Sequence, residues 1–207
     1  MAAAKIYVVF YSMYGHVQTL AEAVAKGAKD AGADVQIFQV AETLSQSVLE
    51  KMKAPPKSDY PVINPKQLAE ADGIIFGVPS RFGMCPAQVK ALFDSTGPLW
   101  RRGQLVGKTA GVFFSTATQA GGQETTALTL CTQFAHHGMI YVPIGYSNPS
   151  LFSMEEIHGG SPYGAGTIAG ADGSRACSQL ELDVAQHQGR HQATITMALK
   201  KGRDTNQ

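Results

Sequence analysis

The sequence predicts an α/β fold in which helices cover both faces of a five-stranded parallel sheet. Two observations support this prediction. Short apolar stretches rich in β-branched and aromatic residues recur five times along the chain, and helical patterns alternate with them. Strands that are separated by helices must run parallel and be joined by right-handed crossovers. The expected architecture is therefore a three-layer α/β sandwich.

Each expected strand has its own signal. Residues 5–11, 72–79 and 108–116 are nearly continuous apolar runs, as in strands that are buried on both faces. Residues 33–40 alternate around Val35 and Ile37, and residues 139–146 form the fifth apolar stretch. Helical periodicity covers residues 17–31, 87–95, 124–137 and 178–200. For five such strands we expect the doubly wound, flavodoxin-like order 2-1-3-4-5.

Two segments do not fit this repeating unit. Residues 45–65 contain four prolines and are expected to form a loop with at most a short helix. Residues 147–176 contain several glycines and little periodicity, and so long a structureless loop is unusual. That segment is expected to be functional, an interface or disordered. We expect residues 1–207 to form one domain with a frayed tail over residues 200–207.

Composition excludes several functional classes. The chain has 207 residues, 44% of them hydrophobic and 16% charged, with a net charge of +1. This balance gives no long-range attraction to nucleic acid or to an anionic membrane. We expect no signal peptide, no integral membrane segment and no metal site. The three cysteines are widely spaced and odd in number, so we expect a reduced, cytoplasmic protein.

The most informative loop joins the first expected strand to the first expected helix. Residues 12–17 carry a hydroxyl and a glycine at a helix start, where free backbone N–H groups favour an anion. The loop has neither the G-x-x-x-x-G-K-[ST] nor the G-x-G-x-x-G spacing. A single terminal phosphate, such as that of FMN, therefore fits better than a triphosphate or a dinucleotide. The alternative is an ordinary strand-to-helix turn that is capped by Ser12.

Ligands of open parallel sheets bind at the carboxyl ends of the strands. That rule selects residues 12–17, 79–86 and 115–124, which are rich in glycine, hydroxyls and backbone donors. None of these loops carries a carboxylate pair, a metal cluster or a serine triad. Such a site suits a bound cofactor that performs the chemistry itself. Arg81, Phe82 and Gly83 can supply donors and an aromatic edge to a flat flavin ring.

The motifs together resemble one family. S-M-Y-G-H at 12–16, P-S-R-F-G at 79–83, G-P-L-W at 97–100, G-G-Q-E at 121–124, H-H-G-M at 136–139, V-P-I-G-Y at 142–146 and the glycine-rich run 159–175 are similar to the WrbA family of NAD(P)H:quinone oxidoreductases. The similarity runs from residue 5 to about residue 188. H-H-G-M and the glycine-rich run are its most specific parts.

The resemblance implies an FMN-dependent enzyme that reduces quinones to hydroquinones by a two-electron ping-pong reaction, with NADH or NADPH as co-substrate. It implies a homotetramer with active sites near subunit boundaries, and a role in quinone detoxification under oxidative stress. Tyr14 would also touch the nicotinamide nucleotide, and Trp100 would contact the quinone. The residues implied to bind FMN are Ser12, Met13, Tyr14, Gly15, His16, Val17, Ser80, Arg81, Phe82, Ser115, Thr116, Ala117, Thr118, Gln119, Ala120, Gly121 and His136.

Other readings of these residues stay open. Without the resemblance, His136 would be a partner of the negative helix end and Trp100 a packing residue. Asp172 and Arg175 are expected to form an ion pair that staples the glycine-rich segment. The alternative functions are a one-electron carrier of flavodoxin type and a non-catalytic flavin-binding assembly protein. A net charge of +1 argues against the carrier, because such carriers dock through strongly acidic faces.

Overall fold

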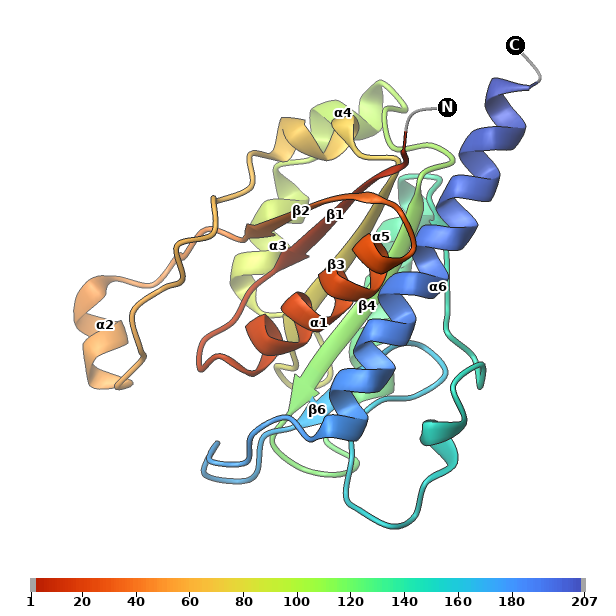
Figure 1. The fold of residues 1–207 in the computed structure, drawn as a ribbon. Coiled ribbons are helices and arrows are strands. Elements are labelled where there is room, and N and C mark those ends of the chain that lie inside the picture. Colours follow the sequence, from red (N-terminus) through yellow and green to blue (C-terminus); the bar gives the residue numbers. More distant parts are fainter. Residues whose placement is uncertain (1–2, 206–207) are drawn as a thin grey trace.

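Parallel strands form the centre of the structure, a computed structural model that describes residues 3–205 (Figure 1). The sheet has the order β2-β1-β3-β4-β5, as the sequence predicts. Its strands are β1 (Lys5–Phe10), β2 (Asp34–Gln39), β3 (Gly73–Pro79), β4 (Thr109–Thr116) and β5 (Ile140–Tyr141). Both β3 and β4 are buried along their whole length, in agreement with their continuous apolar sequences.

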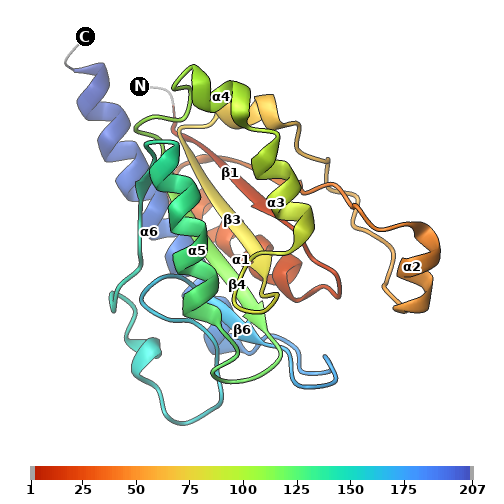
Figure 2. The same cartoon turned by 180° about the vertical axis from the view of Figure 1, so that it is seen from behind.

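Helices cover both faces of this sheet. One face carries α1 (His16–Asp30) and α6 (Gln179–Asp204) (Figure 1). The other carries α3 (Ala87–Asp94) and α5 (Gln123–His136), with α4 (Gly97–Arg101) at one end (Figure 2). Alternate residues of β1 enter the two cores, so that Tyr7 and Val9 pack on one face and Ile6 and Val8 on the other. No helix within residues 3–205 is long and apolar enough to cross a membrane.

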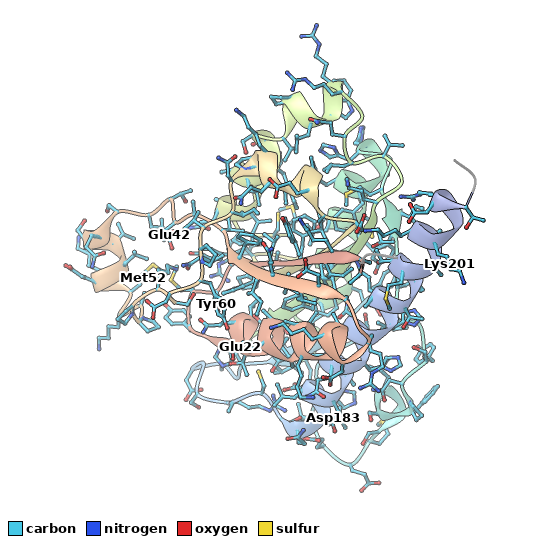
Figure 3. The ribbon with its side chains drawn as sticks, turned by 45° about the horizontal axis from the view of Figure 1, so that its top comes forward. Glu22, Glu42, Met52, Tyr60, Asp183 and Lys201 are labelled. Carbon is cyan, nitrogen blue, oxygen red and sulfur yellow. The ribbon has the colours of Figure 1, made fainter. Side chains whose placement is uncertain are left out.

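The region of residues 45–65 projects from the body as an extended arm. It contains one short helix, α2 (Gln46–Lys51), as expected from its prolines. Glu42 and Tyr60 mark where this arm leaves the body and returns to it, and Met52 lies on its outer part (Figure 3). The short 3-10 helix η1 (Pro65–Glu70) then leads into β3.

The fifth strand differs from the sequence prediction. The strand expected at residues 139–146 is much shorter in the structure. Only β5 forms within it, and β5 pairs with Thr109 and Ala110 in the first half of β4. Beyond it, β6 (Gly166–Ile168) pairs with residues 114–116 in the second half of β4. The glycine-rich segment thus supplies a sixth strand and the 3-10 helix η2 (Pro149–Phe152). Small residues are required here, because a Cβ on Gly164 would lie 1.9 Å from the Val112 carbonyl oxygen.

The two helices on one face touch through glycines. A Cβ on Gly27 of α1 would lie 1.8 Å from the Gln186 carbonyl oxygen, and a Cβ on Gly189 of α6 would lie 1.9 Å from that of Val24. The helix backbones therefore approach closely. Helix α6 continues to Asp204, so the tail expected to be frayed from residue 200 is helical to that point. Residues 206–207 lie outside the described residues.

The close contact between α1 and α6 leads to a prediction about stability. Gly189→Ala should lower the free energy of unfolding by about 1–3 kcal/mol, because the added methyl group must push α1 and α6 apart. Gly202→Ala is the matched control on the same helix, since a Cβ there would meet nothing within 4 Å. It should cause no loss. Urea titration followed by circular dichroism measures both. Equal stability of the two variants would contradict the close-contact account.

Candidate active site

A cleft of about 680 Å³ opens at the carboxyl edge of the sheet. This size suits a small-molecule ligand. Three of its walls come from the loops that follow β1, β3 and β4, as the sequence predicts. The predicted residues that line it are Ser12, Met13, Tyr14, His16, Val17, Ser80, Arg81, Ser115, Thr116 and Ala117. Pro79, in the selected loop 79–86, also lines the cleft, and the lining residues that the sequence did not predict are Met52, Lys53, Ala169, Gly170, Ala171, Asp172 and Gly173.

The loop after β1 prepares the start of α1 for an anion. Gly15 is the N-cap, with φ of 96° and no side-chain hydrogen bond to the helix. The hydroxyl of Ser12 instead accepts the N–H of Gly15 at 3.0 Å, which fixes the turn before the helix. The capping role for Ser12 is therefore wrong. The first N–H groups of the helix have no intrahelical acceptor, so this end can bind a phosphate.

A charged cluster beneath this loop holds it in place. Lys57 donates to the Ser12 carbonyl at 3.2 Å and forms an ion pair with Glu42 at 2.8 Å. Glu42 also accepts hydrogen bonds from Tyr11 and Gln88, each at 2.8 Å. Burial alone would raise the pKa of Glu42, but the bonds from Lys57, the Leu44 N–H, Gln88 and Tyr11 lower that pKa to about 2. The carboxylate stays charged and anchors the arm beside the cleft.

The loop after β3 ends in a tight hairpin turn. Arg81 and Met84 exchange backbone hydrogen bonds of 2.7 and 3.0 Å. The two residues between them, Phe82 and Gly83, both have positive φ, at 54° and 77°. This is the pattern of a type I′ turn, which favours Asn or Gly at both positions. Phe82 is strained there and 99% exposed, although Arg81 beside it lines the cleft.

Some predicted cofactor residues do not line the cleft. Gly15 and Phe82 belong to loops that do, but are not among the lining residues themselves. Residues 118–121 continue the loop after β4 and are exposed. Of the predicted residues 115–121, only Ser115, Thr116 and Ala117 line the cleft.

The ion pair expected between Asp172 and Arg175, at the wall formed by residues 169–173, does not form. Arg175 pairs with the carboxylate of Glu181 at 3.0 Å, whereas Asp172 accepts from the N–H and the hydroxyl of Ser174 at 3.1 and 2.8 Å. Glu181 is fully buried and Asp172 is exposed. A buried carboxylate needs a cationic partner far more than an exposed one. Ser178 followed three residues later by Glu181 is a capping-box pattern, which could have identified Glu181 from the sequence as a bonded residue at the start of α6.

Trp100 and His136 lie at the opposite, amino edge of the sheet. His136 ends α5, and the chain then enters β5, where Ile140 pairs with Thr109, the first residue of β4. The neighbouring His137 bonds to Thr96 at 2.9 Å, just before α4 and Trp100. The eight residues of β4 span the sheet from this edge to the cleft. The two edges are therefore about 20 Å apart. Figure 2 shows α4 and β6 at opposite ends of the molecule.

The chemistry available in the cleft is binding and orientation. Hydroxyls, backbone N–H groups and the cations of Lys53 and Arg81 surround it, with Asp172 as a carboxylate on one wall. Within residues 3–205, no three His, Cys, Asp or Glu side chains gather as a metal ion would require. A flat ligand that carries one phosphate matches this arrangement.

Comparison with known proteins agrees with the geometry. Residues 9–151 match the family model described as NADPH-dependent FMN reductase. The quinone-oxidoreductase QR2 of Triphysaria versicolor is 62% identical, over 96% of this chain and 98% of its own length. The NAD(P)H quinone oxidoreductase PST2 of Candida albicans is 51% identical, over 91% of this chain and 94% of its own.

Solved structures support the fold. A WrbA-like flavodoxin from Agrobacterium tumefaciens superposes with a TM-score of 0.65 at 24% identity, over 95% of this chain and 99% of its own. This likeness confirms the flavodoxin-like architecture.

The strained turn at residues 81–84 leads to a second prediction about stability. Phe82→Asn should raise the free energy of unfolding by roughly 0.5–1 kcal/mol, because asparagine tolerates the left-handed conformation. Phe82→Ala lacks the short polar side chain that lets asparagine hydrogen-bond locally in this conformation, so it should give no such gain. Thermal and urea unfolding of the two variants measure the difference. A loss of stability in Phe82→Asn would mean that the phenyl ring itself supports the fold.

Proposed function

The chain belongs to the NADPH-dependent FMN reductase family, and on this premise we propose that it is an FMN-dependent NAD(P)H:quinone oxidoreductase. Relatives that are 51% to 62% identical over the aligned residues are named quinone oxidoreductases or NAD(P)H dehydrogenase (quinone). The resemblance to the WrbA quinone oxidoreductases, noted from the motifs, leads to the same activity.

The observation that carries the proposal is the start of α1. A helix of 15 residues begins in the cleft with a left-handed glycine and no side-chain cap. Its free N–H groups and the positive end of its dipole fit one terminal phosphate. The adjoining cleft has room for a flat ring system. When bound, FMN supplies the two-electron chemistry that connects a nicotinamide nucleotide to a quinone.

The protein contributes positioning. In this proposal the backbone of residues 12–17 holds the phosphate, and Ser80, Arg81, Ser115, Thr116 and Ala117 border the ring. Tyr14 stands at the mouth, half exposed, with its hydroxyl 3.3 Å from the Met52 carbonyl oxygen, where the nucleotide would meet it. In this proposal the flavin carries the chemistry, so the protein sets the rate through orientation and electrostatics. Nucleotide and quinone would use the same opening in turn, which is a ping-pong reaction.

The amino-edge position of Trp100 and His136 supports a proposed oligomer. One chain cannot bring these side chains to its own cleft, so a neighbouring chain would have to supply them. Exposed apolar side chains gather at this edge, where Trp100 is 60%, Val106 64% and Ile140 40% exposed. Such apolar exposure is typical of protein interfaces. We propose a homotetramer in which this edge of one chain covers the cleft of another.

Cofactor and kinetics test the function together. Flavin released from the protein by denaturation should have the mass of FMN. Without oxygen or quinone, the loaded protein should oxidise about one equivalent of NADH or NADPH per FMN. Continuous turnover should need a benzoquinone and give parallel double-reciprocal lines. Parallel lines are expected because the nucleotide leaves before the quinone enters. Recovery of FAD, or lines that intersect, would contradict the cofactor or the reaction order respectively.

Trp100 tests the shared site. Trp100→Ala should lower kcat/KM for the quinone by roughly two- to tenfold through the lost aromatic contact, with the FMN dissociation constant changed less than twofold. Trp100→Phe, which keeps a ring, should retain most activity.

Co-expression tells whether another chain supplies the tryptophan. Gly15→Val should abolish FMN binding, because φ of 96° excludes a branched side chain. Chains with Gly15→Val mixed with chains carrying both Trp100→Ala and His136→Ala should be more active than the sum of the parents. No gain on mixing would place Trp100 outside the active site.

A further inference from the structure

One fully buried carboxylate lies outside the cleft and organises the segment behind it. Glu181 occupies the first turn of α6 and is 0% exposed. Its oxygens accept the backbone N–H groups of Gly159, Ile168 and Ser178 at 2.9, 3.2 and 2.9 Å. They also accept the Thr167 hydroxyl at 2.7 Å. Desolvating a carboxylate is costly unless it is fully hydrogen-bonded, and this one is.

Arg175 completes the arrangement. Its Nη1 donates to both oxygens of Glu181 at 3.0 Å and to the Ile168 carbonyl at 2.7 Å. Its Nη2 donates to the Ile157 carbonyl at 2.7 Å. Nη1 has two hydrogens, so one N–H is shared between the two Glu181 oxygens while the other bonds to the Ile168 carbonyl, and the rigid fork of the guanidinium leaves Nη2 free for Ile157. The pair therefore connects α6, β6 and residues 157–159.

The backbone of Arg175 also closes the cleft wall at its base. Residues 169–173 line the cleft, and the loop that holds them starts after β6 and ends at Arg175. The N–H of Arg175 donates to the Ala169 carbonyl at 2.9 Å, which joins the two ends of the loop.

The same residue reaches the phosphate loop. The carbonyl oxygen of Arg175 lies 2.9 Å from Nε2 of His16. His16 is the first residue of α1 and lines the cleft. Two walls that are far apart in sequence thus share one buried anchor.

We propose that the Glu181–Arg175 pair is a positioning element for the cofactor: it holds the wall at residues 169–173 and the start of α1 in the FMN-binding arrangement, although neither residue lines the cleft. This inference rests on the proposed FMN site. Without the pair, FMN itself would have to order a glycine-rich loop, and the entropy lost in doing so would be subtracted from its affinity.

The direct test measures flavin affinity in Arg175→Met by fluorescence quenching. The FMN dissociation constant should rise at least tenfold, and amide exchange should become faster over residues 157–175. The loss should be larger for FMN than for riboflavin, which lacks the phosphate, because the link through His16 acts on the phosphate loop.

The control is an ion pair at the amino edge whose cation, Lys200, is as exposed as Arg175, although its carboxylate is not buried as Glu181 is. Lys200 lies 2.8 Å from Asp72, with side chains 27% and 29% exposed. Lys200→Met should leave the FMN dissociation constant within twofold. Arg175→Lys keeps the charge without the fork and should fall between wild type and Arg175→Met. If Arg175→Met does not fold, Arg175→Lys decides by the same criteria.

The outcomes separate the two proposals. Wild-type protein that binds no FMN would overturn the proposed function itself. FMN binding in the wild type, with Arg175 variants that bind within twofold of it or lose no more than Lys200→Met, would overturn the positioning role. An equal loss for FMN and riboflavin would overturn the link to the phosphate loop.

Discussion

Parallel strand pairing determines where the cleft forms and which loops surround it. Because β1, β3, β4 and β6 all run in one direction, their carboxyl ends meet at one edge, and the loops that follow them surround a single cleft. Close packing fixes this edge. A Cβ on Gly77 of β3 would lie 2.2 Å from the Phe113 ring, so the two strands admit only glycine there. The cleft is a consequence of this register, and Ser12, Ser80 and Ser115 meet in it through pairing alone.

The same constraint separates the two ends of every helix that crosses the sheet. Helix α5 starts near the cleft and ends at the amino edge with His136, beside α4 and Trp100. A site that needs both edges therefore needs two chains, and the apolar amino edge offers a surface for that contact. The glycine-rich segment works within one chain. It completes the sheet through β6 and reaches the cleft through residues 169–173, held by the buried charge of Glu181.

Sequence reasoning succeeded where local pattern decides the outcome. Continuous apolar runs identified β1, β3 and β4, and the order of five strands followed. It failed where distant contacts decide. The short β5 and the added β6 depend on a return of the chain that periodicity does not encode.

Met52 and Lys53 line the cleft because Lys57 bonds to Glu42 and to the Ser12 carbonyl, a tertiary contact. Sequence proximity suggested Asp172 as the partner of Arg175, whereas burial selected Glu181. The roles of Trp100 and His136 came from resemblance, and their placement at the far edge could not be read from the motifs.

In the proposed enzyme, the cleft at the carboxyl edge binds FMN and the amino edge of another chain completes it. Trp100 is the single tryptophan, so its fluorescence lifetime reports this directly. Within one chain, α4, which carries Trp100, and the cleft lie near opposite ends of β4, whose length is about 20 Å. We expect FMN to shorten the lifetime strongly in the assembled protein, as contact with a flavin would. Dilution to single chains with flavin still bound should restore a longer lifetime. The same lifetime in assembled and dissociated FMN-loaded protein would contradict it.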